Sequence, residues 1–391
     1  MKRLIAIALL CPALVAAAAD IDSEARRIAA TMPSVKALEA QATAEKESLD
    51  AANVLSGPEA EFEYKFGPEQ NRWGVSIGQE FEFPGVYGAR SRENRLRKRA
   101  FEALYSQELA QRTLDVKLAI ISLAEARQLC DVVAEAAKST DGLCEAYRLA
   151  LKRGETTILE LRKVELRQFA VSQQLAQAMS DRSGAEANLR ALCAGETLQL
   201  SDSLELPALR DYEVYHESFV KANPGLTYSS LMADAENASV STARRSALPS
   251  FRISYIHDFE EDMHFNGFGI SLSLPSWNNR HNVAAARARA FAAEQTLADS
   301  RLLADAQFYA AYDKAQRLHG ELEKGRKLFE ADEYTVYLDK ALKAGRINIF
   351  TYLTEQEDYL QSRLDYISLR ASYARAEAEL AKYLNITPGT I

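Results

Sequence analysis

The chain has 391 residues, and its hydrophobic share of 47% and charged share of 26% are ordinary for an ordered protein. A net charge of −8 argues against nucleic acid as a partner. Beyond the N-terminus no segment has the roughly 18 uninterrupted apolar residues that a spanning helix requires, so any membrane crossing would have to use strands.

The first 19 residues have the pattern of an export signal. Two basic residues are followed by an apolar stretch over residues 4–16, and small residues precede a cleavage site between Ala19 and Asp20. The apolar stretch is too short for a membrane anchor. Cys11 lies inside this stretch behind a bulky leucine, which disfavours acylation of the kind found in lipoproteins. The sequence therefore predicts an exported protein.

The rest of the sequence repeats itself at a spacing of 191 residues. This spacing relates the pairs Pro33 and Pro224, Pro58 and Pro249, Pro84 and Pro275, and Gly154 and Gly345. Proline and glycine constrain the backbone, so shared positions indicate a shared path of the chain. We therefore predict a first repeat over residues 20–193, a linker over 194–223, a second repeat over 224–384 and a C-terminal tail over 385–391.

Each repeat is predicted to contain a helix, two strands, a very long helix, a glycine turn and a returning helix. The opening helix covers residues 34–53, which are rich in strong helix formers. The long helix, from about residue 87 to 152, contains no proline and would approach about 100 Å, a length that calls for packing on neighbouring helices. Whether residues 139–142 interrupt it stays open. Cys130 and Cys144 could form a disulfide only if the chain doubled back between them.

Two segments in each repeat alternate with period two and predict a β-hairpin. Residues 60–66 are apolar at every second position, and residues 73–83 continue the alternation after a turn. The second repeat shows the same pattern over residues 251–255 and 268–274. The apolar faces are aromatic-rich and near the length that a tilted membrane strand needs. A soluble hairpin with one face on a core is the alternative.

Four strands per chain cannot close a barrel, and open edges in lipid would leave backbone groups unpaired at several kcal/mol each. Three copies would supply twelve strands, within the known range of membrane barrels. We therefore predict a mainly α fold with membrane β, in which long coiled-coil helices form a helical barrel below a trimeric 12-stranded barrel. The polar strand faces would line the lumen with Glu61, Glu63, Glu80 and Glu82. Two interpretations of these carboxylates stand. They could make the lumen selective for cations, or they could be the polar residues that any water-filled lumen needs.

At these residues the chain resembles the TolC-like family of outer-membrane efflux proteins. The resemblance rests on the duplicated layout, the strand end 269–275 and the turn segments 147–161 and 342–353, and it covers nearly the whole mature chain. It implies a homotrimer in the lipid bilayer of the bacterial outer membrane, with a large periplasmic tunnel. It also implies a periplasmic adaptor, or membrane fusion protein, that bridges to an inner-membrane pump. Residues 79–90 look most like the branch that works with proton-driven exporters of metals or drugs.

The resemblance places the tunnel tip and the adaptor docking site at the two glycine turns. The residues concerned are Gly154, Glu155, Thr156 and Thr157 in the first turn, and Gly345, Arg346, Ile347 and Asn348 in the second. Some family members close the tunnel with aspartate rings shortly after the second glycine. In this chain those places hold Thr351 and Thr354, and the corresponding first-half place holds Glu160, which is the gate candidate that the resemblance carries over.

A cluster of acidic residues and histidines over residues 257–264 resembles a metal site, but a position at the tip of the second hairpin favours a polar external loop. The sequence has no Ser-His-Asp nucleophile arrangement, no phosphate-binding glycine loop and no HExxH motif, so we predict neither an enzyme nor a cofactor.

The predicted function is the passive outer-membrane channel of a tripartite efflux system for small molecules or metal cations. The exit duct of a type I protein secretion system is an alternative of the same class. A periplasmic adaptor or structural coiled coil is the alternative from a different class, although such a protein gives no reason for two aromatic-faced hairpins.

Overall fold

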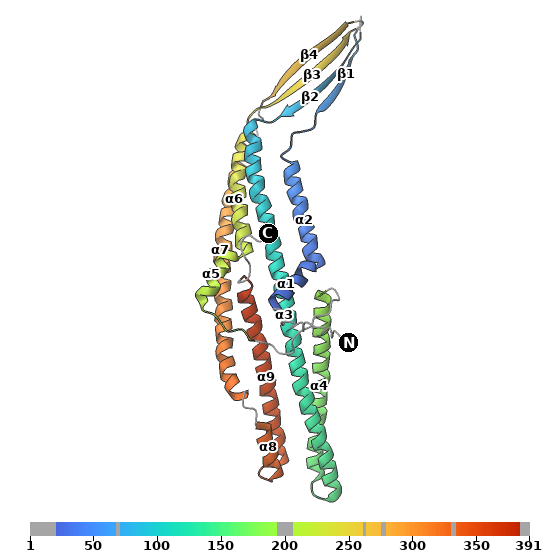
Figure 1. Ribbon diagram of the computed structural model, residues 1–391, viewed down its shortest axis with the longest axis vertical. Coiled ribbons are helices and arrows are strands. Elements are labelled where there is room, and N and C mark those ends of the chain that lie inside the picture. The colour runs from blue at the N-terminus through green and yellow to red at the C-terminus, as the bar shows by residue number, and fades with distance from the viewer. Residues whose placement is uncertain are drawn as a thin grey trace, which may run out of the picture. The chain divides into compact units, whose positions relative to one another are not determined.

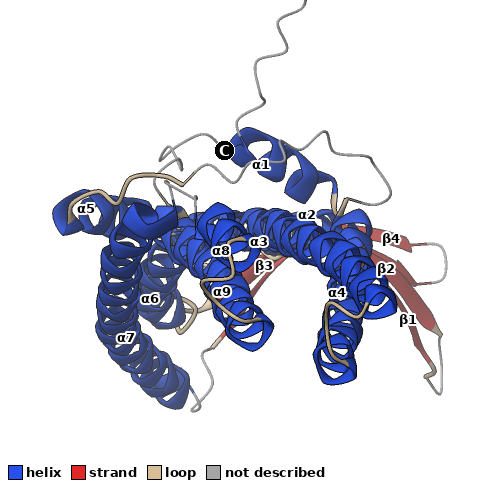
Figure 2. Ribbon diagram, turned by 90° about the horizontal axis from the view of Figure 1, so that it is seen from below, coloured by secondary structure: helices blue, strands red, loops and turns tan. Residues whose placement is uncertain are grey.

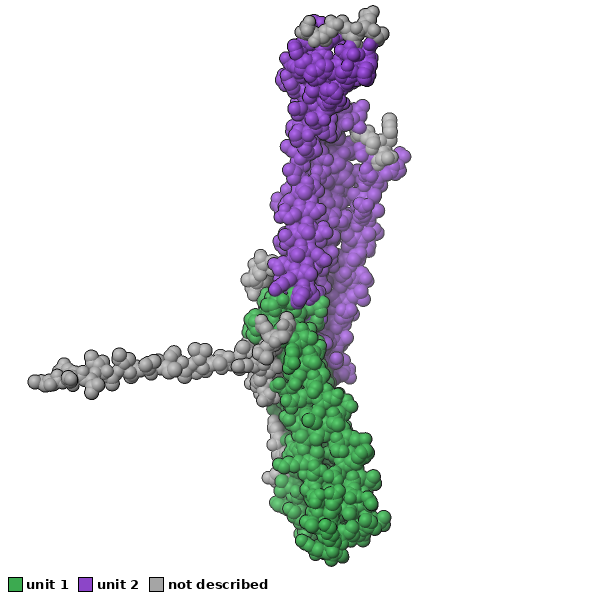
Figure 3. Space-filling model, turned by 90° about the vertical axis from the view of Figure 1, so that its right-hand side faces the viewer, with its two compact units in different colours: residues 1–32, 112–207, 318–378 green, residues 33–111, 208–317, 379–391 purple. Residues whose placement is uncertain are grey.

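The computed structural model of the chain describes residues 21–67, 71–193, 206–260, 263–274, 279–329 and 334–383. The predicted signal segment with Cys11 and the Ala19–Asp20 cleavage site lies outside the described residues, as does the tail 385–391. The chain divides into two compact units (Figure 3). Unit 1 comprises residues 1–32, 112–207 and 318–378, and unit 2 comprises residues 33–111, 208–317 and 379–391.

Unit 2 contains the β-sheet and the helices that adjoin it. These helices are α2 (Pro33–Ala51), the first part of α3 (Pro84–Arg153), α5 (Tyr212–Ala222), α6 (Pro224–Arg245) and the first part of α7 (Asn279–Phe329). The strands are β1 (Glu59–Lys65), β2 (Arg72–Phe81), β3 (Ser250–Glu260) and β4 (Met263–Ser273). They pair antiparallel in the order β1-β2-β3-β4, so that β1 and β4 are the outer strands (Figure 1).

The described secondary structure of unit 1 consists of helices joined by turns. Besides the later parts of α3 and α7, it contains α1 (Ile21–Thr31), α4 (Ile158–Leu192), α8 (Tyr334–Lys343) and most of α9 (Ile349–Ala381). In Figures 1 and 2, α4 lies beside α3 and α8 lies beside α9, which gives two helical hairpins. No described helix is long and apolar enough to cross a membrane.

Helix α3 is continuous over 70 residues, so residues 139–142 do not interrupt it. The Thr140 hydroxyl donates to the Ala136 carbonyl oxygen at 2.8 Å, and Asp141 accepts from the Gln168 side chain of α4 at 2.7 Å. These polar residues are therefore satisfied within the hairpin. Cys130 and Cys144 lie in this same helix roughly 21 Å apart along its axis, whereas a disulfide needs Cα atoms within about 7 Å. The chain does not double back between them, and the two thiols are buried and unbridged.

Two short helices were not predicted. Helices α1 and α5 have 11 residues each and contain neither proline nor glycine, so the punctuation that located the other elements is missing. Helix α5 occupies part of the segment 194–223 that we predicted as a linker. The start of α5 follows that of α1 by 191 residues, and the same spacing separates the starts of α2 and α6, β1 and β3, β2 and β4, and α4 and α9.

The helices pack through small side chains. In unit 1, alanines of α9 meet the apolar face of α3 in a buried cluster formed by Leu114, Ile121, Ala124, Ala371, Ala374 and Ala378. In unit 2, Ala100 and Ala103 of α3 pack on Leu231 of α6. Alanine lets helix backbones approach closely and favours helix formation, so the same residues build the helices and join them.

The register of the sheet separates an apolar face from a polar face. On the apolar face Phe62 lies opposite Val75, and Tyr255 lies between Ile77 and Phe268. This face is exposed: Phe268 is 83% and Ile270 80% accessible. In the described chain the apolar face of the sheet is therefore not covered by a hydrophobic core.

Candidate functional site

The first candidate turn joins α3 to α4 and requires a glycine. Gly154 has a φ of +73°, a left-handed conformation that L side chains rarely adopt. Its N–H donates to the Leu151 carbonyl at 3.0 Å, and the Glu155 N–H donates to the Ala150 carbonyl at 3.0 Å. This pair of bonds is a Schellman motif, which satisfies the last carbonyls of α3 and turns the chain sharply.

The residues after Gly154 start α4 with a capping box. The Glu160 N–H donates to Thr157 Oγ1 at 3.3 Å, and the Glu160 carboxylate accepts from the Thr157 N–H at 2.9 Å. The Thr156 hydroxyl donates to the same carboxylate at 2.6 Å. Hydrogen bonds from Thr156 and then Thr157 hold the pKa of Glu160 below its usual value. The sequence-predicted gate residue is thus bound into the turn as a carboxylate.

The second candidate turn joins α8 to α9 and has the same backbone. Gly345 has a φ of +64°, its N–H donates to the Leu342 carbonyl at 3.0 Å, and the Arg346 N–H donates to the Ala341 carbonyl at 2.9 Å. The cap of α9 differs, because Asn348 accepts the Thr351 N–H at 2.8 Å and no carboxylate is involved in this bond. The two turns therefore share a path but differ in chemistry.

Thr351 and Thr354 lie in the first two turns of α9 and are exposed. The Thr354 hydroxyl donates to the Phe350 carbonyl at 3.1 Å, and the Thr351 N–H is the one that Asn348 caps. Glu160 belongs to the other hairpin. The three predicted gate residues thus lie near the start of the two returning helices, each in a local hydrogen bond.

The two helical hairpins pack on each other close to these turns. Their shared buried cluster consists of Cys144, Val164, Leu338, Ile349, Tyr352 and Leu353. The Tyr352 hydroxyl donates to Asp339 of α8 at 2.6 Å and accepts from Gln356 at 2.8 Å. Burial, followed by the bond to Asp339, raises the pKa of Tyr352.

A buried arginine adds a polar link between the hairpins. Arg167 of α4 is 9% accessible and pairs with Glu357 of α9 at 3.2 Å. Both turns accordingly belong to one packed helical body (Figures 1 and 2).

The predicted acidic residues of the sheet fall into two groups. Glu61, Glu63 and Glu80 lie on the polar face, because Glu61 pairs with Ser76, Glu63 with Gly74 and Glu80 with Arg252. Glu82 lies beyond the end of β2, and its carboxylate pairs with Arg90 of α3 at 2.9 Å. The structure therefore places three of the four carboxylates on one strand surface and the fourth at the junction with the helix.

Basic residues on the same face were missed. Arg252 pairs with Glu59 at 2.6 Å, Lys65 pairs with Glu63 at 2.9 Å, and Arg72 pairs with Glu260. Side chains alternate between the two faces of the sheet along residues 250–260, so the sequence already places Arg252 on the other face from Phe251 and Ile253. The prediction from the apolar members of that strand alone does not use this signal.

The histidine and acidic cluster lies in strands rather than in a loop. Residues 257–260 belong to β3 and residues 263–264 to β4, while Glu261 and Asp262 lie outside the described residues. Ring contacts join side chains of these strands: Phe259 stacks on Trp73 with ring centroids 3.7 Å apart, and the ring centroid of His257 lies 4.2 Å from that of Phe259. Among the described residues no group of three or more His, Cys, Asp or Glu side chains could hold a metal ion.

Comparison with known proteins identifies the fold. No family model and no curated protein sequence matches the chain. A membrane protein from Pseudomonas aeruginosa has 16% identity over 94% of this chain and 93% of its own, with a TM-score of 0.80. The CmeC outer membrane channel of Campylobacter jejuni has 14% identity over 93% of this chain and 85% of its own, with a TM-score of 0.77. The MtrE outer membrane channel of Neisseria gonorrhoeae, in its open state, has 16% identity over 93% of this chain and 88% of its own, with a TM-score of 0.76.

Proposed function

We propose that this chain, whose fold is that of the TolC-like outer-membrane channels, is the passive outer-membrane duct of a tripartite export system. The observation that carries the proposal is the exposed apolar face of the sheet. Phe62, Phe268, Ile270 and Leu272 are each more than 60% accessible on that face. A continuous apolar surface of this kind is rarely left in water and fits a strand surface that faces lipid.

The outer strands of the sheet support assembly from several copies. In lipid the free edges of β1 and β4 would each leave backbone groups unpaired, at several kcal/mol per group. Pairing β1 of one copy with β4 of the next removes both edges. A homotrimer would then have a closed barrel of twelve strands in the lipid bilayer, with the long helices as a periplasmic tunnel.

The N-terminal segment and the repeat complete this proposal. Residues 1–19 would direct export and be removed before Asp20, which fits an outer-membrane protein. The common spacing of the element starts supports duplication of one unit of helix, hairpin, long helix and returning helix. Two copies of this unit per chain give each subunit two hairpins for the barrel and two turns for the tunnel tip.

The partners that we propose are a periplasmic adaptor and a proton-driven inner-membrane pump. The adaptor would dock at the two turns, Gly154–Thr157 and Gly345–Asn348, whose rigid backbone presents short polar and charged segments. Glu160, Thr351 and Thr354 would contribute to closure there. Because hydrogen bonds hold Glu160 in the capping box, it would act through the shape of the turn. The cargo would be small molecules or metal cations that the pump selects.

The proposal is tested by fractionation and by deletion. We expect the full-length protein in the outer membrane, extracted by detergent as a heat-modifiable trimer. A deletion strain should become sensitive in a screen of metals, detergents, bile salts and antibiotics. Recovery as a soluble periplasmic monomer would contradict the duct. Unchanged sensitivity together with loss of a secreted protein would reassign the cargo to a protein.

A further inference from the structure

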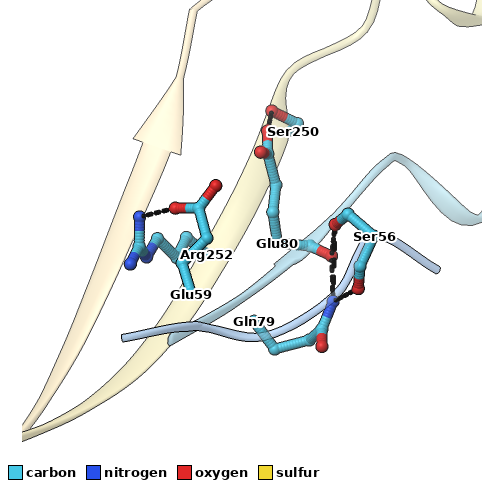
Figure 4. Close-up of polar contacts among 6 residues, drawn as sticks. All are labelled: Ser56, Glu59, Gln79, Glu80, Ser250 and Arg252. Carbon is cyan, nitrogen blue, oxygen red and sulfur yellow. Dashed lines mark hydrogen bonds and ion pairs between the residues drawn. The ribbon is translucent and has the colours of Figure 1, made fainter. Parts of the chain in front are cut away.

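A basic side chain, Arg252, lies among the acidic side chains on the polar face of the sheet. In Figure 4 the Arg252 side chain reaches from β3 to Glu59 of β1, with 2.6 Å between Nη1 and Oε2. Strand β2 lies between these two strands. The ion pair therefore spans three strands, and Arg252 keeps 27% of its side chain accessible to water.

Arg252 does not pair with the acidic residue directly opposite to it. The register places Glu80 opposite Arg252, yet the Glu80 carboxylate accepts from the Ser250 hydroxyl at 2.8 Å (Figure 4). The guanidinium group instead passes over Gly78. A Cβ at Gly78 would overlap Arg252 Nε and lie 3.0 Å from Arg252 Cζ. The absence of a side chain at Gly78 is thus what leaves room for the bridge.

Arg252 sets the net charge at the level of the sheet where Glu59 and Glu80 lie. Elsewhere on the described polar face the basic residues pair with other carboxylates, Lys65 with Glu63 and Arg72 with Glu260. Arg252 is the basic side chain that faces Glu59 and Glu80. With Arg252 in place this level carries one net negative charge per chain, and without it two, because Glu59 and Glu80 would remain.

We propose that Arg252 is a specificity-determining residue of the conduit, which halves the negative charge of an acidic level of the lumen and so eases the passage of small organic anions. This inference rests on the proposed function, in which the polar face lines a water-filled passage. Fixed charges in a narrow passage set which ions concentrate there, and three copies would multiply the effect. Arg252 thereby counteracts the selectivity for cations that the glutamates alone would impose.

The test measures ion selectivity of the purified full-length protein in planar lipid bilayers under a KCl gradient. For R252Q we expect the K⁺ to Cl⁻ permeability ratio to rise roughly two-fold or more, because the level becomes more negative. E59Q should lower the ratio, and R252K should stay near the wild type. An unchanged ratio in R252Q would overturn the inference.

A second pair of variants moves the guanidinium group without changing any charge. G78A places a methyl group where Arg252 crosses β2 and displaces the guanidinium group from Glu59, so we expect the ratio to rise in the same direction as in R252Q but by less, because the charge itself is kept. G267A is the matched control, because a Cβ at Gly267 of β4 meets nothing within 4 Å. Equal K⁺ to Cl⁻ permeability ratios in G78A and G267A would contradict the inference. This comparison keeps the inference testable even if R252Q does not assemble. A wild-type protein that stays a soluble monomer and does not insert into the bilayer would instead refute the proposed function.

Discussion

At the scale of single residues, the two turn glycines carry a testable conformational requirement. A β-branched residue in the left-handed conformation of Gly154 or Gly345 costs roughly 1–2 kcal/mol. We expect Gly154→Val and Gly345→Val to impair export, measured as resistance of cells to the exported compounds, while trimers persist on unheated gels. Gly154→Asn and Gly345→Asn are the controls, since asparagine tolerates this conformation. Normal export by the valine variants would show that these turns are not the docking site.

Glu160 makes a prediction about pH. The pKa of Glu160 is lowered in the folded chain, chiefly by the hydrogen bond from the Thr156 hydroxyl. The ionised carboxylate therefore stabilises the fold at pH values above its unfolded pKa of about 4.5, and this stabilisation is lost as the pH falls through its folded pKa. We expect Glu160→Gln to lower the melting temperature at about pH 7, and this deficit to shrink as pH falls through the folded pKa of Glu160. Thr157→Ala removes the other half of the cap and should cost about 1 kcal/mol. A Glu160→Gln deficit that persisted in acid would rule out the carboxylate cap.

Residue-level rules succeeded where the interaction is local. Glycine after a helix is a signal that the sequence displays directly, and the structure places Gly154 and Gly345 in left-handed turns. The partner of Arg252 could not be predicted in this way. Glu59 is brought to it by the pairing of β2 with β3, which joins two hairpins far apart in sequence.

At the scale of elements, Tyr373 joins α9 to the segment before α5. Its hydroxyl donates to the Pro207 carbonyl at 2.7 Å, and burial, followed by Glu377, raises its pKa to about 12. The neutral phenol therefore stabilises the fold fully below about pH 10, and this contribution is lost as pH rises through about 12. We expect Tyr373→Phe to lower the free energy of unfolding in urea by about 1 kcal/mol at neutral pH. In this variant the free energy of unfolding should also fall less steeply with pH between about 10 and 12 than it does in the wild type.

The matched control for this prediction is Tyr309→Phe on α7, whose side chain is 64% accessible. The free energy of unfolding should be unchanged in that variant at neutral pH. If Tyr373→Phe showed the same alkaline slope as the wild type, the buried phenol would not be the titrating group.

The contact between the two helical hairpins should depend on their shared core. Leu353 is 3% accessible in the cluster near the turns, and truncation of such a residue to alanine costs about 2–5 kcal/mol. We expect Leu353→Ala to lower the unfolding free energy by this amount in chemical denaturation. Leu159→Ala on α4, at a position 73% accessible, is the control and should change it little. Equal effects would indicate that the hairpins do not pack through this cluster.

Periodicity predicted the long elements and missed the short ones. The helix α3, the returning helices and the paired strands follow from proline-free helical spacing and from alternation. The 11-residue helices α1 and α5 offer too few turns for a clear period. Strand β3 extends beyond the predicted residue 255, since its pairing with β2 and β4 continues to Glu260, and such pairing between strands is not visible in the pattern of one strand.

At the scale of the whole molecule, the two faces of the sheet should respond oppositely to charge. An arginine on a lipid-facing strand surface costs about 2–4 kcal/mol at the bilayer midplane, whereas a lumen-facing one is tolerated. We expect Ile270→Arg to reduce the amount of trimer in the outer-membrane fraction. Ser271→Arg, the next residue on the polar face of β4, should leave it near the wild-type level. Similar amounts of trimer in both variants would contradict a lipid-facing apolar surface.

Assembly would cover surfaces that the single chain leaves exposed, among them the ring of Phe268 and the open edge of β1. The number of three follows from the resemblance and from the closure argument. It is therefore a proposal that the trimer and charge experiments address.

The unequal chemistry of the two turns has a consequence for such an assembly. The position after Gly154 is the acid Glu155, and the position after Gly345 is the base Arg346, although the backbones superpose in their hydrogen bonding. Glu155 is paired with Arg153 at 4.0 Å, so the first turn presents an ion pair where the second presents an arginine. A ring of three subunits would then carry six turns of two alternating kinds. An adaptor rotated by one turn would meet the wrong kind at every contact, so docking would have threefold and not sixfold symmetry.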